Sequence, residues 1–140
     1  MKKESRIAIL SHTKLKKYII VLLTVFRYNL IDGICFNIIP NLNVLPEFIR
    51  KCKYIGEVRL IVYLAEDSSK HIYTHIGGLR NILPHYIVVT SNGEILEVGN
   101  VKPSVIRELY TKMNIYEKIN IHKNILQEAI CILEGGVYGE

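Results

Sequence analysis

This sequence of 140 residues has no catalytic motif, no internal repeat and no apolar segment as long as a membrane-spanning helix. Without a period of 20 to 50 residues, repeat architectures are excluded. Without a motif for nucleophilic or carboxylate chemistry, we expect a protein that binds rather than an enzyme. Apolar residues make up 49% of the chain, which excludes a disordered protein and predicts a single domain over residues 1–140 with a substantial core.

The longest apolar run, Tyr18–Phe26, is too short for a membrane helix, which needs about 20 residues. Arg27 and Asn29 stop its extension, seventeen residues precede it, and no small-residue cleavage motif follows it. We therefore expect no signal peptide and no membrane partner, and we interpret the run as part of a buried helix.

Cysteine is scarce, and its spacing contains no C-x-x-C motif. Cys35, Cys52 and Cys131 are odd in number and far apart in the sequence. This usage is typical of a reducing cytosol, in which buried thiols act as small apolar side chains. The prediction is a cytoplasmic protein with three free cysteines.

Positive charge is concentrated at the start of the chain. Residues 1–17 hold six basic side chains against Glu4, and the remaining residues hold 12 basic and 12 acidic side chains, so the net charge of +5 lies in this segment. A basic arm over residues 1–17 attracts phosphate backbones or acidic surfaces. The alternative is a solvated terminus that aids solubility.

Periodicity and turn residues predict mixed secondary structure in the first half of the chain. Val58–Ala65 is ambiguous, because its β-branched residues favour a strand but short apolar runs also occur in buried helices. The other expected elements are strand 6–10, helix 14–29 with Leu15, Ile19, Leu22, Leu23 and Phe26 inward, a turn at Asp32-Gly33, strand 34–39, and helix 44–54 with Leu45, Phe48, Ile49 and Cys52 inward.

The second half alternates in the same way. The expected elements are a helix from Ser68 or Ser69 to Leu83, a hairpin of 85–90 with 94–98 around Asn92-Gly93, helix 103–113 and helix 121–133. The predicted fold class is α/β (α+β), with a small mixed sheet packed by about five helices.

Two patterns suggest metal or phosphate chemistry. His71 and His75 are four residues apart, as a helical metal pair requires, but no third ligand is defined; two solvent-facing histidines are the simpler interpretation. Gly77-Gly78-Leu79-Arg80 lacks the Lys-Ser/Thr of a phosphate-binding loop, so we interpret it as a helix end. No cofactor and no small-molecule substrate are expected.

The segment Ser69-Lys70-His71 is the strongest candidate for nucleic-acid binding. Backbone N–H groups at a helix start attract anions, and Ser, Lys and His side chains add donors and a ring that stacks on bases. The alternative is an ordinary capped helix.

The last predicted helix carries apolar residues on more than one face. A helix too apolar for one contact often serves both a core and a partner. We therefore expect Leu126, Ile130 and Leu133 to bind a partner protein, with complete burial in this domain as the alternative.

The order of these segments resembles the small kinase-binding (TPRKB-type) subunit family of the KEOPS (EKC) complex. The matching pieces are Leu60–Ala65, Ser69-Lys70-His71-Ile72, Tyr86–Val89, Val105–Tyr110 and Ile125–Cys131. The similarity covers about residues 57–134. Two features depart from it: many members have Arg-Gln where this chain has Lys70-His71, and the family has a helix where Val58–Ala65 favours a strand.

The resemblance implies a non-enzymatic subunit in tRNA processing. Members bind a small Bud-type atypical protein kinase, which in turn binds the transferase that forms threonylcarbamoyladenosine in tRNA. Archaeal members are also implied to bind the 3′ CCA end of tRNA. Two other classes remain open: a small basic nucleic-acid-binding or regulatory protein that uses the arm at 1–17, and a metal-dependent enzyme built on His71 and His75.

Overall fold

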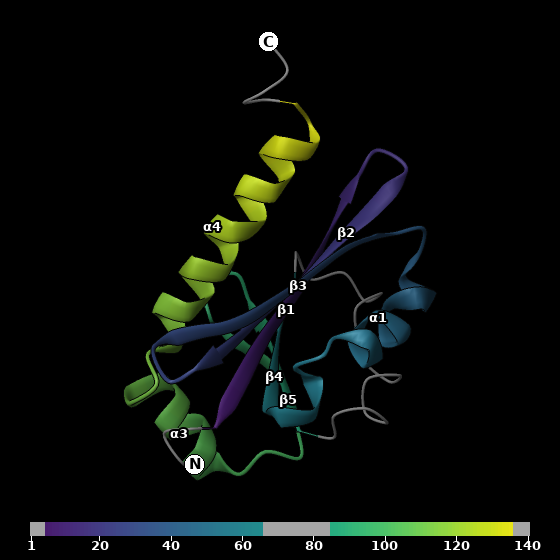
Figure 1. Ribbon diagram of the computed structural model, residues 1–140. Coiled ribbons are helices and arrows are strands. Elements are labelled where there is room, and N and C mark those ends of the chain that lie inside the picture. Colours follow the sequence, from purple (N-terminus) through teal and green to yellow (C-terminus); the bar gives the residue numbers. More distant parts are fainter. Residues whose placement is uncertain (1–4, 66–84, 136–140) are drawn as a thin grey trace.

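A six-stranded mixed sheet forms the centre of the protein (Figure 1). The computed structural model describes residues 5–65 and 85–135. The strand order is β3-β2-β1-β4-β5-β6, so β3 and β6 are the edges. The strands are β1 (Arg6–Leu15), β2 (Tyr18–Arg27), β3 (Leu30–Ile39), β4 (Val58–Ala65), β5 (Tyr86–Thr90) and β6 (Ile95–Gly99).

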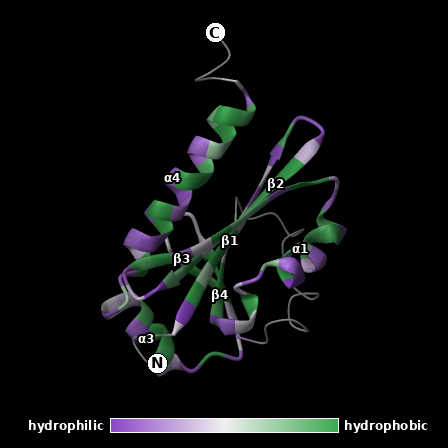
Figure 2. Ribbon diagram, viewed as in Figure 1, coloured by the Kyte–Doolittle hydropathy of each residue, from purple (hydrophilic) through white to green (hydrophobic). Residues whose placement is uncertain are grey.

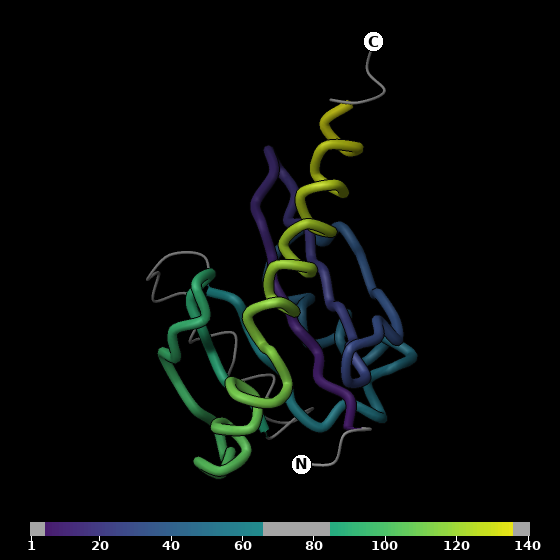
Figure 3. Tube along the Cα trace, turned by 90° about the vertical axis from the view of Figure 1, so that its left-hand side faces the viewer, coloured from purple at the N-terminus to yellow at the C-terminus, as the bar shows by residue number. Residues whose placement is uncertain are grey.

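Helices cover both faces of this sheet. Strands β1, β4 and β5 are parallel to one another, whereas β2, β3 and β6 each pair antiparallel with a neighbour. Helix α1 (Leu45–Lys51) lies on one face, and α3 (Pro103–Thr111) and α4 (Ile115–Leu133) lie on the other, as Figures 1 and 3 show. Mixed α and β structure is confirmed, but the described residues form three α-helices rather than about five.

The helix expected over residues 14–29 is wrong, because this segment contains the end of β1, β2 and the turns on both sides of β2. Strand β2 is an inner strand with helices on both sides of the sheet. Leu22, Thr24 and Phe26 point to the α4 face, while Val21, Leu23 and Val25 point to the α1 face, and all six are buried. A strand buried on both faces reads as a continuous apolar run, which also fits a helix.

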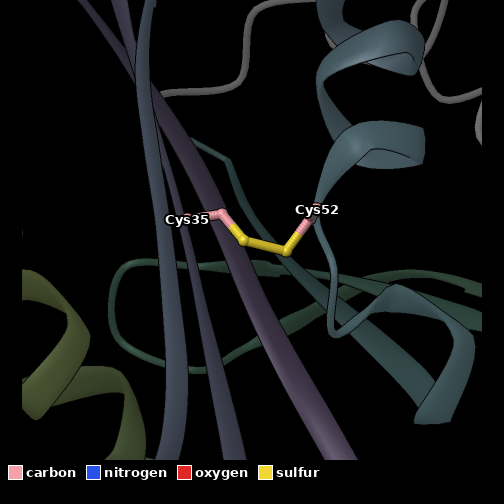
Figure 4. The surroundings of a disulfide bond; sticks show 2 residues. All are labelled: Cys35 and Cys52. Atoms are coloured by element: carbon pink, nitrogen blue, oxygen red, sulfur yellow. A yellow bond between two sulfur atoms is a disulfide. The ribbon is translucent and has the colours of Figure 1, made fainter.

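The α1 face of the sheet is closed by apolar packing and by a disulfide bond. Leu45, Phe48 and Ile49 of α1 are buried against the sheet, as the sequence predicted. Cys35 of β3 and Cys52, which follows α1, form a disulfide with a Cα–Cα distance of 6.0 Å (Figure 4). The prediction of three free cysteines is therefore wrong, and only Cys131 is free among the described residues.

The turn predicted at Asp32-Gly33 is wrong, because both residues lie within β3. The chain reverses at Tyr28 and Asn29, between the paired residues Arg27 and Leu30. Tyr28 adopts a left-handed conformation with φ 56°. Gly33 is required for a different reason: a Cβ atom here would lie 2.2 Å from the ring of Tyr54.

The other strands and helices predicted within the described residues are present, although α1 ends at Lys51 and α4 begins at Ile115. Val58–Ala65 is β4, so the helix that the family resemblance implies there is wrong. The hairpin around Asn92-Gly93 is formed by β5 and β6, and Gly93 has φ 88°. Tyr110 of α3 donates a hydrogen bond to the carbonyl oxygen of Gly93 (2.6 Å), and burial raises the pKa of this tyrosine to about 12.

The start of the chain is part of the sheet. Ile7 and Leu10 are fully buried in β1, between β2 and β4. Arg6 pairs with Asp32 and with Glu57, and the hydrogen bond from Arg6 lowers the pKa of Asp32. From Arg6 to Leu15, the segment expected to be a basic arm is therefore a central strand. No helix in the described ranges 5–65 and 85–135 is long and apolar enough to cross a membrane.

Candidate functional site

The first half of α4 is fixed to the sheet by a buried histidine. His122 is fully buried, and its Nε2 lies 2.6 Å from Oγ of Ser11 on β1. Its Nδ1 lies 2.8 Å from Oγ1 of Thr24 on β2. A neutral imidazole has one donor and one acceptor nitrogen, and hydroxyl groups serve either role, so both ring nitrogens are satisfied.

These three residues offer no active site despite their Ser-His pairing. Ser11 is 3% exposed, and Thr24 and His122 are not exposed at all. Burial lowers the pKa of His122 to about 3, so the ring stays neutral at ordinary pH. A substrate cannot reach the Ser11 hydroxyl, and the trio acts as a polar contact between helix and sheet.

The course of α4 over the sheet follows from its contacts. The ammonium group of Lys118 lies 5.9 Å from the ring centroid of Phe26, and His122 lies against Thr24, so the helix runs along β2 toward the start of that strand. Leu126, Ile130 and Leu133 follow His122 at helical spacing on roughly its side. The three residues predicted to bind a partner therefore lie on the side of α4 that faces the sheet.

This side of α4 is nevertheless only partly covered. Leu126 and Ile130 are half-buried, and Leu133 is 42% exposed. The earlier core positions Ile115 and Ile119 are almost completely buried. Burial of apolar side chains thus decreases along the helix, and complete burial, which the sequence left open as the alternative to partner binding, does not describe these residues.

Edge strand β3 exposes apolar side chains on the same face of the sheet. Ile34, Phe36 and Ile38 pair with Thr24, Leu22 and Ile20 of β2, and opposite residues of an antiparallel pair share a face. They are 47%, 41% and 40% exposed. The backbone N–H of Ile38 donates a hydrogen bond to Oδ1 of its neighbour Asn37 (2.8 Å).

These apolar side chains of β3 and α4 lie on the same face of the sheet, and we refer to them together as the β3–α4 surface. It comprises Ile34, Phe36, Ile38, Leu126, Ile130 and Leu133. Figure 2 shows hydrophobic residues along β3 and in the last turns of α4. Exposed apolar side chains gathered on one side of a protein mark sites of interaction. The sequence predicted the helical part only; the alternation of Ile34, Phe36 and Ile38 was visible but indicated an ordinary half-buried strand.

The turn between β1 and β2 gathers part of the basic charge. Lys14, Lys16 and Lys17 line a shallow pocket of about 630 Å³ together with Asn41 and Asn43. Lys16 holds a left-handed conformation with φ 56°. Three ammonium groups around one hollow form a cationic patch, whereas Arg6 at the other end of β1 is engaged in ion pairs.

Other predicted site residues lie outside the described part of the chain. These are Ser69, Lys70 and His71 for nucleic acid, and His75 as a metal partner of His71. Among the residues that the structure does describe, no three His, Cys, Asp or Glu side chains are grouped as metal ligands.

Comparison with known proteins gives no functional assignment. No protein-family model matches the chain, and no characterised protein is similar in sequence. Among solved structures, a protein of unknown function from Archaeoglobus fulgidus is similar with a TM-score of 0.43 and 14% identity, over 86% of this chain and 68% of its own. A similarity at this level carries no argument about function.

Proposed function

We propose that this protein is a non-catalytic accessory subunit that binds a partner protein through the β3–α4 surface. The observation that carries the proposal is the set of six apolar side chains on one side of the sheet that the fold leaves partly exposed. Burying such side chains in an interface is favourable by about 25 cal/mol per Å² of apolar area. Their place on an edge strand and an adjacent helix suits a partner that contributes an apolar helix or strand.

The family resemblance supplies a specific partner for this proposal. In this proposal the protein bound at the β3–α4 surface is the small atypical protein kinase of the KEOPS complex. The present chain then assists the formation of threonylcarbamoyladenosine in tRNA. Within this proposal, Ser69, Lys70 and His71 contact the 3′ end of tRNA, and the assembly is cytoplasmic. Replacing these three residues with Ala is expected to weaken tRNA binding at fixed salt concentration, and unchanged binding would remove the tRNA contact from the proposal.

Two arginine substitutions of equal chemistry test the protein contact. Leu133 in the β3–α4 surface and Leu96 on the opposite edge strand β6 are 42% and 43% exposed, so Leu133→Arg and Leu96→Arg disturb the fold equally little. We expect Leu133→Arg to abolish co-purification with the kinase and Leu96→Arg to leave it intact. Equal co-purification of the two variants would place the interface elsewhere.

The cationic turn supports a second candidate function, which is nucleic-acid binding without a kinase partner. Lys14, Lys16 and Lys17 surround one hollow, and cations at this spacing neutralise phosphates of a polynucleotide. In this case the triple change to Gln would weaken RNA binding and reduce its dependence on salt concentration, while Leu133→Arg would have no effect on it.

A further inference from the structure

A pocket of about 710 Å³ opens beside α3, away from the β3–α4 surface. It lies where the amino ends of β4 and β5 meet the end of β6 and the first turn of α3. This is the lower end of the sheet in Figure 1. We call it the α3 pocket. Its volume falls within the range of about 300–1,000 Å³ that is typical of small-molecule sites.

One wall of the α3 pocket carries positive charge. Arg59 and Lys102 line it, and neither has a carboxylate partner among residues 5–65 and 85–135. No described aspartate or glutamate lines the pocket. Two cations beside one cavity, with no described carboxylate in its lining, attract an anionic group.

A β-bulge turns Arg59 toward this pocket. Arg6 of β1 pairs with Val58 and Ile7 pairs with Leu60, so Arg59 is an additional residue in β4 with no partner opposite. A bulge re-aims the side chain of the additional residue. The residues on both sides of Arg59 are buried, while Arg59 itself is exposed.

A histidine adds a further polar group with a fixed orientation. Nδ1 of His85 lies 2.7 Å from the carbonyl oxygen of Asn100. A carbonyl oxygen only accepts hydrogen bonds, so Nδ1 carries the hydrogen and Nε2 is left for another partner. His85 lies in the lining of the α3 pocket.

The rest of the described lining is mixed. Val98, Val101 and Val105 are apolar and partly exposed, Leu60 of β4 is apolar but only 2% exposed, and Ser5 and Asn100 are polar. Inorganic phosphate would use the cations but leave the three valine side chains uncovered. A neutral apolar molecule would cover them but leave Arg59 and Lys102 unpaired.

We propose that the α3 pocket binds a small organic phosphate ester whose phosphate lies between Arg59 and Lys102 and whose flat or apolar group covers Val98, Val101 and Val105. A planar guanidinium and a flexible ammonium together suit the three oxygens of a phosphate monoester. His85 donates or accepts at the edge of the ligand. This site is independent of the proposed function, because none of its residues belongs to the β3–α4 surface.

Titration of the full chain at low salt with four probes tests this proposal. Phenyl phosphate carries both required groups, inorganic phosphate and benzyl alcohol each carry one of them, and glycerol 3-phosphate has a polar group in place of the ring. We expect phenyl phosphate to bind at least about tenfold more tightly than the other three, with NMR shifts at Val98 and Val105. Equal affinity for glycerol 3-phosphate would overturn the role of the apolar wall.

Matched variants locate the binding. Arg59→Gln and Lys102→Gln are each expected to weaken binding of phenyl phosphate about tenfold, since each removes one charge-assisted contact. Arg107→Gln and Lys112→Gln change the same residue types at other exposed positions of α3 and its end, and are expected to have no effect. No saturable binding at roughly 10 mM, or binding that Arg59→Gln and Lys102→Gln leave unchanged, would overturn the proposal.

Discussion

The two faces of the sheet are closed by different means and to different extents. On the α1 face, the helix residues Leu45 and Ile49 are fully buried, and the Cys35–Cys52 disulfide ties the end of α1 to β3. On the α4 face, His122 fixes the helix by two hydrogen bonds, but Leu133 beyond it stays 42% exposed. The α1 face is thus closed by buried side chains and a disulfide, while the α4 face combines a holding contact with partly exposed apolar side chains.

Removing the imidazole of His122 is the largest expected disturbance of this arrangement. His122→Ala deprives the buried hydroxyls of Ser11 and Thr24 of their partner and leaves a cavity. Each unsatisfied hydroxyl costs about 1–3 kcal/mol, so we expect a loss of about 4 kcal/mol in the free energy of unfolding. Urea denaturation at neutral pH measures this loss in the free energy of unfolding.

His85→Ala is the matched control, because His85 is exposed and lies outside both core clusters. Its expected cost is within about 0.5–1 kcal/mol. If His122→Ala were as stable as this control, the buried trio would not hold α4 to the sheet.

Opening the disulfide is expected to have the next largest effect, and on the other face. The bonded cysteines are 17 residues apart, and closing a loop of this size stabilises a protein by about 3 kcal/mol. A double change, Cys35→Ala with Cys52→Ala, should lower the free energy of unfolding by this amount. Cys131→Ala should change it little, because this half-buried cysteine is free.

A count of reactive thiols tests the same bond without any substitution. Unfolded, unreduced protein is expected to contain one reactive thiol, and reduced protein three. Three reactive thiols before reduction would show that all three cysteines are free, as the sequence predicted, and that the disulfide is absent.

The disulfide and the strand identity of β2 escaped sequence analysis for physical reasons. Cys35 and Cys52 meet only because α1 folds back over β3, and their 17-residue spacing has no motif. Leu22 and Leu23 are successive strand residues and both are buried, so β2 reads as a continuous apolar run that a helix fits equally well. Local signals were reliable where the chain itself decides the conformation, as at Asn92-Gly93 and at Pro103, the first residue of α3.

Only the α4 part of the β3–α4 surface could be predicted from the sequence, for a related reason. The sequence of the last helix contains more apolar residues than one helix face can bury, and Leu126 and Ile130 are among them. The contribution of Phe36 depends on β3 being an edge strand, which is a property of strand order rather than of local sequence. The α3 pocket depends in the same way on a bulge at Arg59.

Acid is expected to loosen the α4 face through His122. The pKa of this histidine is about 3 in the folded protein and about 6.5 in the unfolded chain, so only the unfolded chain takes up a proton between these values. Stability is therefore complete above pH 6.5 and falls as pH decreases, with a slope approaching about 1.4 kcal/mol per pH unit.

Urea denaturation between about pH 6.5 and 4.5 isolates this effect, because the Asp32 contribution is lost only below the ordinary pKa of that carboxyl group, 3.8. His122→Leu should reduce the slope in this range. A slope unchanged by His122→Leu would assign the acid sensitivity to other groups.

Hydrogen–deuterium exchange of the full chain, with and without the kinase partner, tests the central claim most directly. If the open part of the α4 face is the binding surface, the partner should slow exchange in β3 and in the last turns of α4, while α1 and β6 exchange as before. Protection confined to α1 or β6, with none in Ile34–Ile38 or Leu126–Leu133, would contradict the account.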